Sequence, residues 1–550
     1  MPQTVARLLV DSLEAHDIDL IYCVPGESYL GMTNALADNN RMRLIVCRHE
    51  GGAAFMAAAD GRMRGGRAGV CVVSRGPGLS NAMIGIHTAY HDATPLVVFI
   101  GQVERFEAGR LALQEQNYSV LLGDITKAVI EVNDPIQASE AVARAFHIAE
   151  SGTPGPVAII IPEDVFDTET EAALNRPRPA AQGGPLPADL DRLAEMLAAA
   201  ERPLIWVGAT LKESAIPALT KLAEQWVLPV SPTHRRPHLF DAGHPNYGGY
   251  MASRVHADMV AEMKKTDLLV ALGERLTGSL TQGFTFPAAP EPQMPLVHVW
   301  PDPNEVGRVW RPDLAMACEP SSVVQALLAR GAPTGAEKRR GWVSGLNAIH
   351  KRVSKPEWEA MPDGVNFSAV IAAVNRHLAD DATVTSDAGN FATFVHRYLM
   401  MKPGQMFLAS VVGAMGSGLP MGVAACLRRP GTQVIAFAGD GGALMTGNEL
   451  ATARQYRVNP VFIVSDNNCY GTITQHHDMR YPGRPYQAAT QLTNPDFAIW
   501  ATAFGAKGMT IHEEPEVDGV IAEALSVKDQ PVVVHVHTSL QQISAWRRRG

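Results

Sequence analysis

Short apolar runs alternate with segments of helical periodicity along almost the whole chain. Runs of strand length lie at residues 20–24, 43–47, 69–74, 202–208, 228–230, 267–273, 296–300, 434–438 and 461–464. Most of them are followed by a stretch in which apolar residues repeat every three or four positions, as on one face of a helix. Strands that alternate with helices favour parallel pairing. The pattern therefore predicts an α/β fold of doubly wound, mainly parallel sheets.

Two polar stretches interrupt this alternation. Residues 175–185 and 331–340 are rich in proline, glycine and charged side chains, a composition that is typical of linkers. A chain of 550 residues is also too long for one hydrophobic core, because single cores stop growing at about 250–300 residues. The sequence predicts three domains, at residues 1–175, 186–332 and 360–550.

The amino-acid composition and net charge of the chain limit which classes of partner are expected. The chain has 56 acidic and 47 basic residues and a net charge of −9, without long blocks of like charge. We therefore expect neither nucleic acid nor a membrane as partner. The six cysteines are scattered and show no CxxC spacing, which argues against a zinc site and favours a reducing, cytoplasmic location. No signal peptide and no apolar run of about 20 residues is recognised.

The densest candidate chemistry lies between residues 434 and 473. A predicted strand runs into Gly439-Asp440-Gly441-Gly442, a single helix is predicted through residues 444–453, and the next strand leads to a loop with Asn467. Loops at the carboxyl ends of parallel strands are where open α/β sheets bind ligands. Carboxylate and amide oxygens suit Mg²⁺, and glycine N–H groups at a helix start suit phosphate. An Asp-Gly pair alone is usually only a turn. The whole pattern, with 467 − 440 = 27 residues between the candidate ligands, predicts a metal-diphosphate cradle.

A second candidate is Glu50, where the strand at 43–47 gives way to His49-Glu50-Gly51-Gly52-Ala53-Ala54. On its residues alone, the simplest interpretation is a carboxylate that the helix dipole favours at a helix N-terminus. His49 is expected to be structural.

Taken together, these two segments resemble the thiamine diphosphate enzymes, the family that contains acetolactate synthase, pyruvate decarboxylase, benzoylformate decarboxylase and benzaldehyde lyase. The resemblance implies a Mg²⁺ ion bound by Asp440, Asn467 and the main-chain oxygen of Cys469. It also implies that Glu50 hydrogen-bonds N1′ of the cofactor's aminopyrimidine and so promotes deprotonation of the thiazolium ring. Asp466 stands where relatives commonly have asparagine, at a position that is not a ligand.

The resemblance further implies a set of residues that contact thiamine diphosphate. It names the three domains pyrimidine-binding, central and diphosphate-binding, and it makes Met415 the apolar wedge under the bent cofactor. The implied contacts, besides Glu50, Asp440 and Asn467, are Pro25, Gly76, Asn81, Gly389, Asn390, Phe391, Gly413, Met415, Gly439, Gly441, Gly442, Tyr470, Gly471 and Thr472.

The expected substrate is a small 2-oxo acid, and the first expectation is acetolactate synthase-like carboligation. By resemblance, Gln114 and Lys127 lie near the reacting carbons. Three positions depart from the synthase pattern: Leu113 replaces phenylalanine, Glu27 replaces a glycine, and His476 replaces a tryptophan that shapes the acceptor site. Glu27 and His476 are candidate catalytic residues, although Glu27 is equally compatible with a solvated loop charge.

These departures keep other functions open. A 2-oxo acid decarboxylase and a lyase acting on 2-hydroxy ketones or diketones are the nearer alternatives. A non-catalytic cofactor-binding subunit is more distant, because Glu50 and the metal pair are all present. In this family the pyrimidine-binding half of one subunit meets the diphosphate-binding half of another, so a homodimer or homotetramer is expected.

The central domain raises the question of FAD. Residues 271–275 and 297–302 resemble strand ends that help hold a structural FAD in acetolactate synthases. However, residues 233–238 differ from the synthase loop, and the domain has no GxGxxG fingerprint. The sequence is compatible with a bound FAD and with none. Arg235 and Arg236 are expected in a solvated loop, with anion binding as the alternative.

Overall fold

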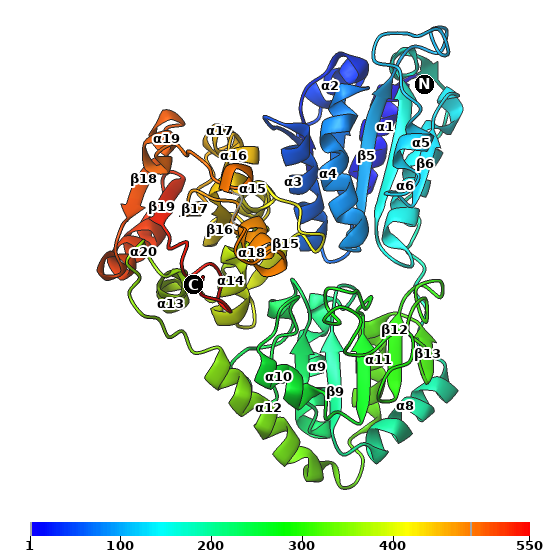
Figure 1. Cartoon of the computed structure of the whole chain (residues 1–550). Coiled ribbons are helices and arrows are strands. Elements are labelled where there is room, and N and C mark those ends of the chain that lie inside the picture. The colour runs from blue at the N-terminus through cyan, green and yellow to red at the C-terminus, as the bar shows by residue number, and fades with distance from the viewer. Residues whose placement is uncertain (1–2, 485–486, 550) are drawn as a thin grey trace. The chain divides into compact units, whose positions relative to one another are not determined.

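The computed structural model describes residues 3–484 and 487–549 of the chain. This part contains three parallel β-sheets and a two-stranded antiparallel pair formed by β1 (Gln3–Thr4) and β8 (Glu169–Thr170). Helices cover the faces of the parallel sheets (Figure 1). The predicted fold class, three doubly wound α/β domains, is confirmed. Within the described residues, none of the helices combines the length and the apolar character that crossing a membrane requires.

The first sheet has the strand order β3-β2-β4-β5-β7-β6. Helices α1 and α6 pack on one side of it through apolar residues such as Leu9, Val97 and Phe146. Helix α3 is made largely of glycine and alanine, and a Cβ added to Gly85 of α4 would overlap Ala54 of α3. Small residues therefore let these two helices approach closely. The elements are α1 (Val5–Ala15), β2 (Leu20–Cys23), α2 (Leu30–Ala37), β3 (Arg43–Val46), α3 (Glu50–Met63), β4 (Gly69–Val73), α4 (Pro77–His91), β5 (Leu96–Gln102), α5 (Tyr118–Leu122), β6 (Ala128–Glu131), α6 (Ala138–Glu150), β7 (Pro156–Pro162) and α7 (Glu163–Phe166).

The second sheet has the order β10-β9-β11-β12-β13, so the chain reverses its direction of growth between β9 and β11. Trp226 lies in the core on one side of the sheet, and Trp206 and Trp342 lie in the core on the other. The elements are α8 (Pro187–Ala199), β9 (Pro203–Val207), α9 (Ile216–Trp226), β10 (Val230–Pro232), α10 (Ala257–Met263), β11 (Leu268–Leu272), β12 (Leu296–Trp300), β13 (Leu314–Ala317), α11 (Pro320–Arg330) and α12 (Arg340–Val353).

The third sheet has the order β15-β14-β16-β17-β19-β18. Its core joins α13, α14 and α20 to the strands through residues such as Val370, Phe394 and Phe437. The elements are α13 (Phe367–His377), β14 (Thr383–Ser386), α14 (Phe391–Tyr398), β15 (Met406–Ala409), α15 (Gly418–Arg428), β16 (Val434–Gly439), α16 (Asp440–Thr446), α17 (Glu449–Gln455), β17 (Val461–Asp466), α18 (Gly471–Arg480), α19 (Phe497–Ala503), β18 (Lys507–Ile511), α20 (Val517–Ser526) and β19 (Val532–His537).

By contacts, the chain divides into two compact units that do not follow the three sheets. The first unit joins the residues up to Ala181 to residues 410–430 and 444–458, and the second holds the rest. Helices α15 and α17 therefore pack with the first sheet's domain. Arg428 of α15 contacts Asp19 at 2.7 Å and Asp60 at 2.5 Å, and Asp60 is only 1% exposed. Arg428 thus links α15 to one buried and one half-exposed carboxylate of the first sheet's domain.

The single helix predicted through residues 444–453 is wrong. The structure has two helices there, α16 and α17, which are separated at Gly447 and Asn448. Glycine is a poor helix former. The second helix begins at Glu449, whose buried carboxylate accepts N–H bonds from Arg48 and His49 of the first domain. This tertiary contact is invisible to the local periodicity.

Candidate active site

Asp440 is the first residue of α16 and follows β16 directly, so it lies at a helix start rather than in the predicted loop. Its side chain is buried, at 4% exposure. One carboxylate oxygen accepts the N–H of Gly441 at 2.8 Å, and the other accepts the N–H of Cys469 at 3.1 Å. The carboxylate is therefore fixed against the loop that holds the other predicted metal ligands.

Asn467 and Cys469 lie in that loop, after β17. The side-chain oxygen of Asn467 is buried and has no hydrogen-bond partner among residues 3–484 and 487–549. A buried amide oxygen without a partner is costly, so it marks a place for a missing donor or cation. The main-chain oxygen of Cys469 accepts the N–H of Gly471 at 2.7 Å and keeps a second lone pair. A carboxylate, an amide oxygen and a carbonyl form a donor set that fits Mg²⁺.

Asn494 completes this half of the site, and the sequence analysis missed it. Its amide nitrogen donates to Asp440 at 2.9 Å and to Asp466 at 2.8 Å, so it joins two carboxylates that repel each other. Burial raises the pKa of Asp440 to about 6, and the charge of Asp466 acts in the same direction. The two hydrogen bonds of the amide partly offset this repulsion.

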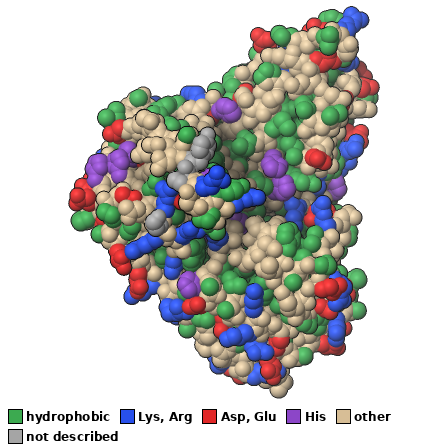
Figure 2. Space-filling view, viewed as in Figure 1, with side chains coloured by type: hydrophobic (Ala, Val, Ile, Leu, Met, Phe, Trp, Pro, Cys, Tyr) green, Lys and Arg blue, Asp and Glu red, His purple; other side chains and the backbone are tan. Residues whose placement is uncertain are grey.

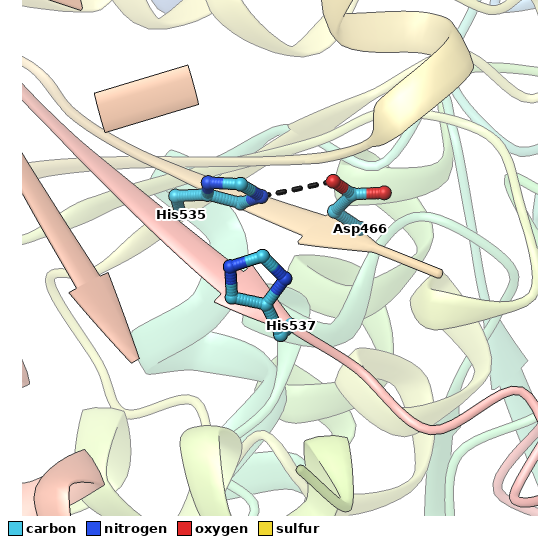
Figure 3. A group of neighbouring side chains, drawn as sticks. All are labelled: Asp466, His535 and His537. Carbon is cyan, nitrogen blue, oxygen red and sulfur yellow. Dashed lines mark hydrogen bonds and ion pairs between the residues drawn. The ribbon is translucent and has the colours of Figure 1, made fainter. Parts of the chain in front are cut away.

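Asp466 ends β17 and lies beside two histidines of the neighbouring strand β19 (Figure 3). Nε2 of His535 lies 2.9 Å from Oδ2 of Asp466, and both side chains are 3% exposed. His537 stands opposite Asp466 in the strand register. Burial acts to raise the pKa of Asp466, but hydrogen bonds from His535 and from the N–H of Asn468 hold it below its usual value. Asp466 is thus an anion that anchors the strand end leading to Asn467.

Histidine side chains also gather at the surface over β18 and β19 (Figure 2). His537 stacks on His512, with ring centroids 4.5 Å apart. His535, His537 and Asp466 bring three ligand atoms within 4.8 Å of one another. Because the Asp466 carboxylate is already held by His535 and Asn494, we assign this group a structural role beside the loop that contains the predicted metal ligands.

The structure brings the predicted diphosphate contacts of the second unit together. Asn390 accepts a hydrogen bond from Thr472 at 3.2 Å and donates to Gln475 at 3.2 Å. Gly389 has φ of 148°, which favours glycine. Three further glycines of the set allow close packing: a Cβ on Gly439 would press on Phe391, one on Gly441 would overlap Tyr470, and one on Gly471 would lie 3.2 Å from Asn467. Gly442 is buried in α16.

Glu50 begins α3 in the first unit and is half-buried. Its Oε2 accepts a hydrogen bond from the amide of Asn81, on α4, at 2.9 Å. The structure therefore pairs two residues that resemblance assigned to the cofactor site. His49 accepts the N–H of Gly51 at 2.9 Å and caps the helix, so the predicted structural role of His49 is confirmed.

Glu449, also missed from the sequence, supports this turn from α17. It is fully buried and accepts the N–H groups of Arg48 and His49, each at 3.0 Å. A Cβ on Gly52 would overlap its carboxylate. Glu449 thereby fixes the backbone immediately before Glu50. No local motif links these positions, because about 400 residues separate them along the chain.

Several predicted positions of the first unit surround the loops that follow β2 and β4. Gly76 has φ of 59°, donates its N–H to the hydroxyl of Tyr118 at 3.0 Å and packs against the exposed Gln114. Glu27 and Pro25 are exposed in the loop after β2.

Gly413 and Met415 lie in the loop before α15, and Met415 is half-buried rather than part of the core. His476 is exposed on α18, in the second unit. Lys127 has local partners: its ammonium donates to the main-chain oxygens of Ile148 and Ser151, where α6 ends. Cations at a helix C-terminus are stabilising, which gives this lysine a structural role.

The prediction of a solvated loop for Arg235 and Arg236 is wrong. Both side chains are 4% exposed. Arg235 directs its guanidinium at the main-chain oxygen of Asp387, and the charge of Arg236 acts on Glu274. Tertiary partners, which the local sequence does not reveal, bury both cations.

Comparison with known proteins decides the family. Three models described as thiamine pyrophosphate enzyme domains match the chain: the N-terminal TPP binding domain at residues 3–120, the central domain at 190–327 and the C-terminal TPP binding domain at 387–536. The chain belongs to the thiamine pyrophosphate enzyme family.

Within this family the chain is similar to acetolactate synthases over nearly its full length. It is 31% identical to the acetolactate synthase large subunit of Parasynechococcus marenigrum, with 98% of this chain and 88% of the relative covered. It is 30% identical to a protein of Methanocaldococcus jannaschii named "Probable acetolactate synthase large subunit", with 96% and 91% covered. The isozyme 1 large subunit of Escherichia coli is 28% identical, with 98% and 94% covered. The chain is thus a thiamine diphosphate-dependent enzyme of the acetolactate synthase-like branch.

Proposed function

We propose that this enzyme joins carbon–carbon bonds between 2-oxo acids, as an acetolactate synthase-like carboligase that uses thiamine diphosphate and Mg²⁺. The observation that carries the proposal is a pair of side chains. The buried side-chain oxygen of Asn467 has no hydrogen-bond partner among the described residues, and the carboxylate of Asp440 is hydrogen-bonded to the N–H of Cys469 in the same loop. The names of the relatives support the choice of 2-oxo acids as substrates.

For the metal, we assign Asp440, Asn467 and the main-chain oxygen of Cys469 as the three protein ligands. Two of them are oxygens of neutral groups, so phosphate oxygens can complete the octahedral shell that Mg²⁺ prefers. The N–H groups at the start of α16 and the loop at Gly389 and Asn390 would then face the diphosphate.

For catalysis, we assign Glu50 as the proton-transfer group at N1′ of the cofactor's pyrimidine. When bound, thiamine diphosphate supplies a carbon nucleophile for attack on a carbonyl and an electron sink for the release of CO₂. Asn81 donates to Oε2 of Glu50 and so leaves Oε1 for the cofactor. Glu449 holds the preceding backbone, which keeps the carboxylate oriented. Gln114 and Glu27 are assigned to the substrate side.

A second candidate function is cleavage or simple decarboxylation, in place of carboligation. The exposed His476 on α18 occupies the position where synthases resembling this chain have tryptophan. A smaller, polar side chain at this position favours either a different acceptor substrate or protonation of the intermediate instead of attack on an acceptor.

The experiment is a panel of 2-oxo acids, 2-hydroxy ketones and diketones incubated with the enzyme, thiamine diphosphate and Mg²⁺. Acetolactate from pyruvate supports carboligation. Aldehyde and CO₂ without a coupled product support decarboxylation, and cleavage of the ketones supports a lyase. Absence of turnover with every compound, in protein that binds the cofactor, overturns the proposal.

We also propose that the enzyme works as a homodimer or homotetramer. An apolar group in the segment around α5 supports this proposal, because Phe106, Leu111, Leu113 and Val120 are 64%, 98%, 76% and 76% exposed. Exposed apolar groups of this kind mark interaction surfaces. The domain bounds 1–175, 186–332 and 360–550 remain part of the proposal.

A further inference from the structure

The strand order of the central sheet defines where a ligand crevice would lie. Its strand order places β10 on one side of β9 and β11 on the other, so the topological switch point lies between β9 and β11. Dinucleotides bind doubly wound sheets at this point, outside the carboxyl ends of the strands, where a glycine lets the diphosphate approach the backbone. The residues at this point are Gly208 after β9 and Gly273 with Glu274 after β11.

Glu274 fills this crevice with its own side chain. A Cβ on Gly208 would overlap its carboxylate, so the space beside that glycine is already taken. The carboxylate accepts a hydrogen bond from the hydroxyl of Thr233, which follows β10, and from the N–H of Arg275 at 3.0 Å. His298, on β12, lies 3.0 Å from the main-chain oxygen of Glu274. Glu274 thus ties together the ends of four adjacent strands and is 9% exposed.

The charge at this point is also unfavourable for a dinucleotide. A diphosphate is anionic, and a carboxylate within a few ångströms of it repels it strongly at low dielectric. Burial raises the pKa of Glu274, while the hydrogen bond from Thr233 and the charge of the nearby Arg236 act in the opposite direction and favour the carboxylate. The residues present therefore do not fit FAD.

The cavity next to the switch point of the central sheet is small. The arginines that line it are already paired with a carboxylate. A cavity of about 230 Å³ is lined by residues that include Arg275, His298, Arg308 and Trp310. Typical ligand pockets have about 300–1,000 Å³. Glu305 pairs with Arg275 at 3.5 Å and with Arg308 at 3.2 Å, so both guanidinium groups are engaged within the domain.

Arg235, from the same segment as Thr233 and Arg236, reaches the third domain. Both of its terminal nitrogens lie 3.4 Å from the main-chain oxygen of Asp387. Asp387 is 1% exposed and begins the loop that leads to Gly389 and Asn390, two of the assigned diphosphate contacts. A buried guanidinium that donates to a loop carbonyl restrains the loop's backbone.

We propose that the central domain carries no flavin and serves instead as a brace, in which Glu274 closes the nucleotide crevice and Arg235 positions the diphosphate loop. The part that concerns Arg235 rests on the proposed binding of thiamine diphosphate. The part that concerns Glu274 stands independently of it.

The first test uses the whole purified protein and FAD. Its visible absorbance should show no flavin, and added FAD should give no saturable change in fluorescence anisotropy, with a flavoprotein as positive control. ADP is titrated in parallel by calorimetry. Saturable binding of FAD or of ADP to the wild-type enzyme would overturn the closed crevice.

The second test measures the dissociation constant of thiamine diphosphate, at saturating Mg²⁺, by quenching of intrinsic fluorescence. Arg235→Gln should weaken binding about tenfold, as the loss of a hydrogen bond from a charged group does. Arg311→Gln removes an exposed ion pair with Glu291 in the same domain and should bind like the wild type. Circular dichroism checks the fold of each variant.

The outcomes separate this inference from the proposed function. If the wild-type protein does not bind thiamine diphosphate, the proposed function is refuted. If the wild type binds it and a folded Arg235→Gln variant binds it with unchanged affinity, the positioning role of Arg235 is refuted. If Arg235→Gln does not fold, Arg235→Lys is decisive, because lysine keeps the charge but offers no fork of two nitrogens to one oxygen. Its affinity should then be several-fold weaker, and an unchanged value refutes the brace.

Discussion

Asp466 and His535 form a buried pair across two adjacent parallel strands, with Nε2 of the histidine 2.9 Å from Oδ2 of the aspartate. The pair explains the departure at position 466, where the resembling enzymes commonly have asparagine. A buried carboxylate needs a compensating donor, and the next strand supplies it. Where the resemblance leads us to expect a neutral asparagine, this chain has a charged side chain with its own partner.

We predict that the two residues are energetically coupled. Asp466→Asn and His535→Gln should each lower the free energy of unfolding by about 1.5–3 kcal/mol, since a buried partner is left behind. The double variant should lose clearly less than the sum. A double-mutant cycle from denaturant unfolding measures this difference. Additive losses within about 0.5 kcal/mol would contradict the coupling.

The proposed metal ligands could be selected from the sequence because they follow strand ends in one βαβ unit. Asp440 and Asn467 are each preceded by an apolar run, and parallel strands bring their carboxyl ends to one edge. Asn494 and His535 could not be found in this way. They come from segments 28 and 69 residues beyond Asp466, and a lone asparagine or histidine carries no signal of its contacts.

The fold was predictable for a related reason. Strand and helix periods differ clearly in this chain, and alternation alone indicates parallel sheets. Burial of charge was not predictable. Arg235 and Arg236 have the composition of a surface loop, yet their partners Asp387 and Glu274 lie far along the chain and exclude solvent from both.

Asn494 should be needed for metal affinity although it is not an assigned ligand. Asn494→Ala leaves Asp440 and Asp466 without the shared donor, so the Asp440 carboxylate is no longer held in one orientation. We expect the dissociation constant of Mg²⁺, measured by calorimetry with thiamine diphosphate present, to rise about 10–100-fold. Asn494→Asp also removes the donor, but its added negative charge attracts the cation, so its affinity should fall less than that of Asn494→Ala. Wild-type affinity in both variants would refute the role.

Glu50→Gln should abolish turnover and leave most cofactor binding intact. Glutamine keeps the shape of the side chain and can still accept the bond from Asn81, but it cannot transfer a proton at the pyrimidine. The loss should be at least about 100-fold in kcat, with a small change in the dissociation constant of thiamine diphosphate. Glu140→Gln, at an exposed position of the same unit, is the matched control. Activity like that of the wild type would remove Glu50 from the mechanism.

The apolar group around α5 should be needed for self-association. Leu111 is 98% exposed, so Leu111→Asp removes no core contact of a single chain. In an interface, however, an unpaired buried carboxylate is costly, and the complex should dissociate. Analytical ultracentrifugation should show a shift to smaller species at unchanged helix content. Leu174→Asp, at a 48% exposed position outside the group, is the control. An unchanged mass for Leu111→Asp would place the interface elsewhere.

Acid should destabilise the central part of the chain, because two of its histidines are buried and take up protons more readily once the chain unfolds. Burial lowers the pKa of His298 and of His350 to about 4, from 6.5, and both side chains are almost inaccessible. The unfolded chain therefore binds more protons than the folded one between these values, and stability is lost as pH falls from about 6.5 towards 4. Each histidine contributes up to about 3 kcal/mol. Urea unfolding, followed by the buried tryptophans, measures the effect against pH. His298→Gln should flatten the profile relative to the wild type, whereas His512→Gln, at an exposed position, should leave it unchanged; a His298→Gln profile with the wild-type slope would show that His298 is not the group that titrates.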